Sequence, residues 1–189
     1  MGIRDTSYYG WKNIDVFNLA SPNKSFSSSY TDIAVDSSGS IYTSGWIFAT
    51  SSVQQENSWL VRKSIDDGKS FYTLFLSTSV DTLLNRALAI TVDPQDRVYV
   101  LGTNKTAGFN AVVMSSSDHG NTWGSQLLVE ESVGAGSRND IVLGLASDLT
   151  GNIFLSTLDN AFSSSDKGVT WGTQILIGTP TVPGSSDVV

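Results

Sequence analysis

The sequence predicts an all-β protein made of repeated four-stranded units. Two observations carry this prediction: a turn motif occurs three times along the 189 residues, and a pair of apolar runs joined by a short turn accompanies it. No stretch of about ten residues shows the apolar spacing of an amphipathic helix. Five Trp, six Tyr and eight Phe supply enough apolar bulk for a folded core.

The first repeated motif reads Ser-x-Asp-x-Gly-x-Ser/Thr followed by an aromatic residue. Its three copies occupy residues 64–71, 116–123 and 164–171. Equivalent positions are therefore about 50 residues apart, which lies within the range of repeat periods seen in propellers.

The second repeated motif is an apolar run, a turn opened by Asp and another apolar run. It occurs at residues 32–42, 88–99 and 143–154. Gly39 and Gly151 stand where these turns require a positive φ, and Asp96 takes that position in the middle copy. The first run of each copy predicts an inner strand packed on both faces. The second run alternates, as expected of a half-solvated outer strand.

Each unit therefore contains four expected strands. They lie at about 30–36, 40–48, 58–64 and 70–77, then 87–93, 97–103, 109–116 and 121–130, then 141–148, 152–158, 160–165 and 169–177. The units are assigned to residues 30–78, 79–131 and 132–178. Residues 1–29 are assigned to the last strand of a preceding unit plus a linker, and 179–189 to a linker and the start of a next inner strand. Such units are typical of the blades of a β-propeller.

The turn motif resembles the Asp-box, or bacterial neuraminidase repeat, of sialidases and of many non-enzymatic propellers. The resemblance covers three blades, which is most of the chain, and implies a sialidase-like propeller fold. It implies structural hairpins in which Asp accepts backbone N–H bonds, Gly takes a left-handed step and the aromatic residue packs between blades rather than on a sugar. These structural residues are Ser64, Asp66, Gly68, Phe71, Ser116, Asp118, Gly120, Trp123, Ser164, Asp166, Gly168 and Trp171.

Enzyme activity is not expected, although a sialidase resemblance would also imply three carboxylate-binding arginines, a Tyr–Glu nucleophile pair and an Asp acid. The Arg-Ile-Pro motif that normally supplies one arginine is missing, because none of the four prolines follows Arg-Ile. Glu130, Glu131 and Asp140 could be proposed as glycosidase carboxylates, but adjacent acids in a Gly-rich loop are more often a solvated loop. We assign no catalytic residue. A fragment of a sialidase-like glycoside hydrolase is the alternative.

A ligand-binding surface is expected where an outer strand returns to an inner one, the end at which propellers usually place their pockets. Arg86 and Arg138 lie at such returns. With Asn139 and Asp140 they are the predicted ligand-binding residues, and a glycan is the candidate ligand. The competing interpretation is that both arginines simply pair with nearby acids.

Composition excludes several chemistries. The chain has no Cys, which excludes disulfides and thiolate nucleophiles, and its single His119, at a hairpin tip and expected to be solvated, cannot build a multi-His zinc site. We expect no metal and no cofactor. A net charge of -7 argues against nucleic acid, and no apolar run approaches the roughly 20 residues of a membrane span. Residues 1–5 do not begin a signal peptide, yet low charge and abundant Ser and Thr suit a secreted or cell-surface protein of bacterial or phage type.

Three blades are too few for a closed ring, which needs at least about four. The chain is therefore a fragment of a longer propeller, half of a C2 pair, or a small monomer whose two ends combine into a fourth blade. We expect one of the first two, with a second copy or further blades of a parent chain as partner. The predicted function is a non-catalytic propeller module for ligand binding or for structural assembly, the latter on a cell surface or phage particle.

Overall fold

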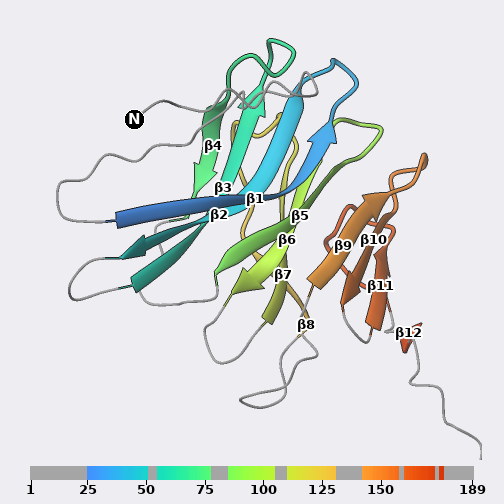
Figure 1. The fold of residues 1–189 in the computed structure, drawn as a ribbon. Coiled ribbons are helices and arrows are strands. Elements are labelled where there is room, and N and C mark those ends of the chain that lie inside the picture. The colour runs from blue at the N-terminus through green and yellow to red at the C-terminus, as the bar shows by residue number, and fades with distance from the viewer. Residues whose placement is uncertain are drawn as a thin grey trace, which may run out of the picture.

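The computed structural model describes residues 25–50, 55–77, 85–104, 110–130, 142–157, 160–172 and 175–176. They form three four-stranded antiparallel sheets (Figure 1). The first contains β1 (Ser25–Val35), β2 (Ile41–Thr50), β3 (Gln55–Ser64) and β4 (Tyr72–Leu76). The second contains β5 (Arg86–Val92), β6 (Val98–Asn104), β7 (Asn110–Ser116) and β8 (Leu127–Glu130). The third contains β9 (Val142–Ser147), β10 (Ile153–Thr157), β11 (Asn160–Ser164) and β12 (Ile175–Leu176).

Strand order within each sheet follows the sequence, so each sheet is an antiparallel meander. The predicted fold class, three four-stranded blades of a β-propeller, is confirmed. The sheets are called blades 1, 2 and 3 below. β1 begins at Ser25, inside the segment assigned to 1–29, and the predicted terminal strand stubs lie outside the described residues.

The inner strands β1, β5 and β9 lie next to one another and hold the blades together. A bulge at Thr31 lets its hydroxyl donate to the Ala87 carbonyl oxygen at 2.9 Å. The Asp32 carboxylate accepts the Ile90 N–H at 3.0 Å. These bonds link β1 to β5 through side chains, because inner strands of different blades share no backbone ladder.

Burial of the strands differs from the sequence-based expectation. The inner strand β1 is mostly exposed, with Ile33 at 62% and Val35 at 57%, whereas the middle strands β2, β6 and β7 are buried on both faces. For β6 and β7 the reason is geometric, because they lie between blades 1 and 3 and contribute side chains to both seams. Only β5, which has a described blade on each side, buries Ala87, Ala89 and Ile90 among the inner strands.

Two apolar clusters fill the two seams between blades. The first joins Tyr42, Trp59 and Val61 of blade 1 to Val98, Val100 and Met114 of blade 2. The second joins Tyr99, Leu101 and Val113 of blade 2 to Ile153, Leu155 and Phe162 of blade 3. The hydrophobic core of the described chain is therefore made of interfaces between sheets, as in other repeat proteins.

The three copies of the turn motif form hairpins of one geometry, called repeat hairpins below (64–71, 116–123 and 164–171). In each, the Ser hydroxyl donates to the Asp carboxylate at 2.7–2.8 Å and accepts the Gly N–H at 2.8–2.9 Å. The Asp carboxylate also accepts a backbone N–H from four residues further on at 2.8–2.9 Å. Gly68, Gly120 and Gly168 adopt φ of 78°, 88° and 81°. Trp123 packs against the first seam and Trp171 against the second, and Phe71 is half-buried.

Acid is expected to weaken the fold through these hairpins. The pKa values of Asp66, Asp118 and Asp166 are lowered from 3.8 to about 2. The largest cause in each case is a hydrogen bond from the hydroxyl of Ser70, Thr122 or Thr170, and the next is a bond from the N–H of the same residue. Between about pH 4 and pH 2 the unfolded chain therefore binds more protons, so stability present above pH 4 is lost as the pH falls through that window. Urea denaturation across this range measures the loss. In a triple Ser70→Ala, Thr122→Ala, Thr170→Ala variant, the free energy of unfolding should fall less steeply with decreasing pH than in the wild type. An equally steep fall would show that the hydroxyl groups do not cause the pH dependence.

Candidate functional site

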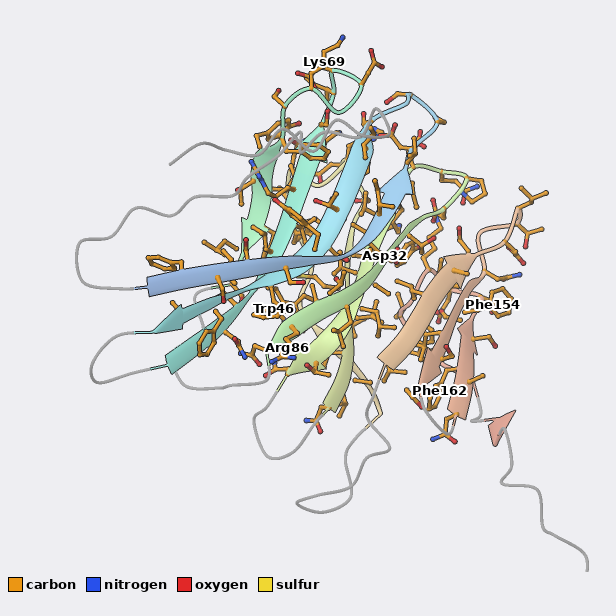
Figure 2. All side chains as sticks on the ribbon, viewed as in Figure 1. Asp32, Trp46, Lys69, Arg86, Phe154 and Phe162 are labelled. Carbon is orange, nitrogen blue, oxygen red and sulfur yellow. The ribbon has the colours of Figure 1, made fainter. Side chains whose placement is uncertain are left out.

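Arg86 is the predicted ligand-binding residue that the structure places. It opens β5, opposite Thr103 of β6, and its guanidinium lies 4.6 Å from the centroid of the Trp46 ring of β2. The pair joins blades 1 and 2 at the end of the sheets away from the repeat hairpins, as the positions of Lys69 and Arg86 in Figure 2 show. Such a cation–π contact contributes about 0.5–2 kcal/mol.

The Arg86 guanidinium stacks on the Trp46 ring. Within the described part of the chain no carboxylate pairs with it, and its buried Nε has no hydrogen-bond partner. Of the other predicted binding residues, Arg138, Asn139 and Asp140 lie outside the described residues. The structure therefore places one member of the predicted site.

Buried polar groups surround the Arg86–Trp46 pair. Asn85 precedes Arg86 in sequence, Thr103 faces it across the ladder, and both side chains are nearly inaccessible. The Trp59 indole N–H donates to the Thr103 carbonyl at 3.0 Å, so a second tryptophan fixes this strand end. The half-buried Trp46 ring and the Arg86 guanidinium are the partly accessible groups here, and such a pair can stack a ring and hydrogen-bond its substituents.

Every carboxylate whose side chain the structure describes serves a structural contact. Asp32 bridges β1 and β5, Asp67 pairs with Lys69 at 3.6 Å, and Asp96 accepts both the N–H and the hydroxyl of Ser37. The others cap turns: Asp36, Asp66, Asp93, Asp118, Asp148 and Asp166. Hydrogen bonds lower the pKa to about 2 for Asp66, Asp118, Asp148 and Asp166.

Asp36 is one of two buried acids in the described chain, together with Asp93. Burial alone would raise its pKa, but hydrogen bonds from Ser38, Tyr42 and Ser40 together outweigh burial and hold the pKa well below its usual range. Burial raises the Tyr42 pKa, and its bond to Asp36 raises it further. The His119 side chain, predicted to be solvated, is 49% exposed, and its Nδ1 lies 3.6 Å from the Asp36 carboxylate.

The seam tyrosines were not singled out from the sequence. Tyr42 and Tyr99 are fully buried, and each hydroxyl donates to the Asp that opens the preceding turn, at 2.9 and 3.0 Å. The second repeated motif contained a signal for them, because the second residue of its second apolar run is aromatic in every copy. This residue is Tyr in the first two copies and Phe154 in the third. Phe154 is 45% exposed.

The described surface includes two hollows at the repeat-hairpin side and at the turns of the blades. One, of about 250 Å³, is enclosed by the turns that join the first two strands of the three blades, and includes Val35, Val92 and Leu149. The other, of about 360 Å³, lies on blade 3. It is lined by Asn152, Phe154, Ser163, Ser164, Ser165, Thr170, Trp171 and Gly172. It lies at the opposite end of the blades from Arg86 (Figure 2).

Two features are absent from the described ranges, namely a metal-ligating cluster and a membrane-spanning helix. No group of three or more His, Cys, Asp or Glu residues there could hold a metal ion. Nor does that part of the chain contain a helix long and apolar enough to cross a bilayer.

Comparison with known proteins identifies the fold and no family. No protein-family model matches the sequence, and no curated protein is significantly similar to it. A solved structure of a protein of unknown function from Dyadobacter fermentans matches with a TM-score of 0.55 and 16% identity, over 80% of this chain and 51% of that one. The GH93 α-L-arabinofuranosidase of Fusarium graminearum, in complex with arabinobiose, matches with a TM-score of 0.52 and 14% identity. This match covers 77% of this chain and 47% of the arabinofuranosidase. The chain thus spans about half the length of these structures, and the likeness establishes its propeller-like fold.

Proposed function

We propose that this chain is part of an Asp-box β-propeller that binds a saccharide without catalysing a reaction. The observation that carries the proposal is the use of the acids: all nine carboxylates with described side chains are turn caps, strand bridges or a surface ion pair. None is held ready for proton transfer.

Glycoside hydrolysis needs one carboxyl group that is protonated near the working pH and a second that is ionised. A carboxylate with a pKa of about 2 that accepts several hydrogen bonds remains ionised and is a poor general acid. The described acids therefore support a binding role over a catalytic one.

The Arg86–Trp46 pair supports a saccharide as the ligand. A tryptophan edge and an arginine free of carboxylate partners among the described residues offer both stacking and directed hydrogen bonds. The arabinofuranosidase that shares the fold was solved with a bound disaccharide, which makes carbohydrate a reasonable first ligand class to test.

Binding to a glycan array tests this proposal. We expect the wild-type chain to retain a defined set of glycans, and Arg86→Ala and Trp46→Ala to weaken binding by about tenfold each, because either change removes one half of the stacked pair. Arg97→Ala, beside a turn at the opposite end of β6, is the matched control and should bind like the wild type. Glycan binding that survives both test substitutions would place the site elsewhere.

A fragment of a glycosidase is the second candidate, because the match to the arabinofuranosidase covers only 47% of that enzyme. Catalytic residues would then lie outside the described residues or in another part of a longer protein. Fluorogenic α-L-arabinofuranosides and sialosides separate the candidates. Turnover that a single Glu or Arg substitution abolishes would refute the non-catalytic proposal.

A further inference from the structure

We propose that the open face of blade 3 carries a second binding site, for an uncharged saccharide seated on the ring of Phe154. The site is distinct from the Arg86–Trp46 pair and lies at the repeat-hairpin end of the blade. Figure 2 shows Phe154 on the side of blade 3 that faces away from the other blades.

The equivalent position in blade 1 is filled from within the seam. Tyr42 is fully buried there, and the Lys63 ammonium lies 4.8 Å from the centroid of its ring. Both the Tyr42 hydroxyl and Lys63 Nζ approach the His119 carbonyl oxygen of the next repeat hairpin, at 3.4 and 3.3 Å. Two polar clamps therefore fasten the hairpin of blade 2 over this ring.

The equivalent position in blade 2 is filled by apolar packing. Tyr99 is fully buried, and Gly168 of the third repeat hairpin sits so close that a Cβ there would lie 3.5 Å from the tyrosine ring. Leu101 and Val113, on the same face, are buried in the seam with blade 3.

Blade 3 has neither arrangement. Strand pairing places Phe154, Ser156, Ala161 and Ser163 at the positions of Tyr99, Leu101, Val113 and Ser115. Phe154 lacks the hydroxyl group of Tyr99, and Ser156 and Ala161 are small where blade 2 has Leu101 and Val113. Ser163 also stands where blade 1 has Lys63. This face is therefore better suited to a small polar ligand than to another repeat hairpin.

The pocket on this face has the size and lining of a sugar subsite. Its volume of about 360 Å³ lies within the roughly 300–1,000 Å³ of small-molecule sites. The 45%-exposed Phe154 ring offers an apolar surface for the C–H face of a sugar, while Ser163 and Ser165 offer hydroxyl groups. The Thr170 hydroxyl and the Asn152 amide N–H groups already donate within the repeat, so these two residues offer acceptor oxygens. The Ser163 side chain is exposed and lines the pocket.

An uncharged ligand follows from the same lining. None of the eight lining residues is ionisable, and the chain carries a net charge of -7. An anionic sugar would meet no cation in the pocket and an unfavourable overall field. Trp171 remains a core residue that packs on the second seam and contributes only one side to the pocket.

Saturation-transfer NMR and calorimetry with cellobiose, maltose and lactose test the proposal. We expect at least one of these disaccharides to bind. Phe154→Ala should weaken its binding about tenfold by removing the stacking surface. Ser163→Lys, which installs the blade 1 residue that covers the ring, should abolish binding, whereas Phe154→Tyr should leave it within about twofold. Tyr72→Ala removes a similarly exposed aromatic residue (46%) from blade 1 and is the matched control.

The outcomes separate this proposal from the proposed function. Loss of binding with Phe154→Ala and Ser163→Lys, but not with Arg86→Ala, supports the blade 3 site. Binding that responds only to Arg86→Ala or Trp46→Ala overturns the blade 3 site and leaves the proposed function standing. Absence of binding to any saccharide overturns both. A dimer by light scattering that Phe154→Asp dissociates would also overturn the site, because the face would then be a seam between copies.

Discussion

Replacing Gly102 by Ala is expected to lower the free energy of unfolding by about 3 kcal/mol or more. A Cβ at this position would lie 2.1 Å from the Arg86 carbonyl oxygen and 2.6 Å from Cζ2 of Trp59. The first neighbour is backbone and the second is a buried indole held by its bond to Thr103, so neither can move without opening the seam. The same displacement would separate Arg86 from Trp46, so saccharide binding at that pair should fall with stability.

Gly124→Ala is the control for this prediction. Its nearest neighbour would be the Ser115 carbonyl oxygen at 3.5 Å, an ordinary van der Waals contact. Urea denaturation of the two variants should show a large loss of stability for Gly102→Ala and a change of less than about 1 kcal/mol for Gly124→Ala. Equal stabilities would mean that β6 can shift within the seam.

Removing the Asp36 carboxylate is the second change with a large expected effect. In Asp36→Ala, the N–H groups of Ser38 and Ser40 and the hydroxyl of Tyr42 lose their acceptor in a buried setting. We expect a loss of about 2–4 kcal/mol, since several donors that share one acceptor are left unsatisfied together.

The repeats supply an internal comparison for Asp36. Asp93→Ala should cost a similar amount, because Asp93 accepts the Arg97 N–H and the buried Tyr99 hydroxyl in the same way. Asp148→Ala should cost less, because Phe154 donates nothing to it and its partners are exposed or half-buried. Thermal and urea unfolding of the three variants measure the order. A loss for Asp148→Ala as large as the other two would show that the turn, and not the seam tyrosine, controls the effect.

Local features of the fold could be predicted because each depends on a few neighbouring residues. Gly39 and Gly151 adopt φ of 85° and 88°, and Asp96 takes the same left-handed position with φ of 59°. The confirmed strand order follows from short turns, which leave a meander as the simplest arrangement.

Contacts between different blades could not be predicted from the sequence pattern. Nothing in the spacing of the motifs indicates that Arg86 would stack on Trp46, a residue 40 positions earlier. The steric need for Gly102 was equally hidden, because it arises where the inner strand of the same blade bulges toward β6.

The reversed burial of the strands has the same origin. Hydropathy alone does not distinguish a strand at the axis from one sandwiched between sheets, because both contain apolar residues. β1 contains Ile33 and Val35 yet leaves them exposed, while β2 buries Thr43 and Ser44. Position among the blades, and not composition, decides which strand is covered.

The contacts across the seams have a consequence for synthesis on the ribosome. The bonds that fasten one blade to the next join residues between 44 and 77 positions apart, such as Trp59 to Thr103 and Tyr42 to His119. At a translation rate of roughly 5–20 residues per second, several seconds pass between the synthesis of Tyr42 and that of the hairpin residues that cover it. A nascent single blade therefore presents a bare aromatic surface, and the smallest part of this chain that can hide its own core is a pair of adjacent blades.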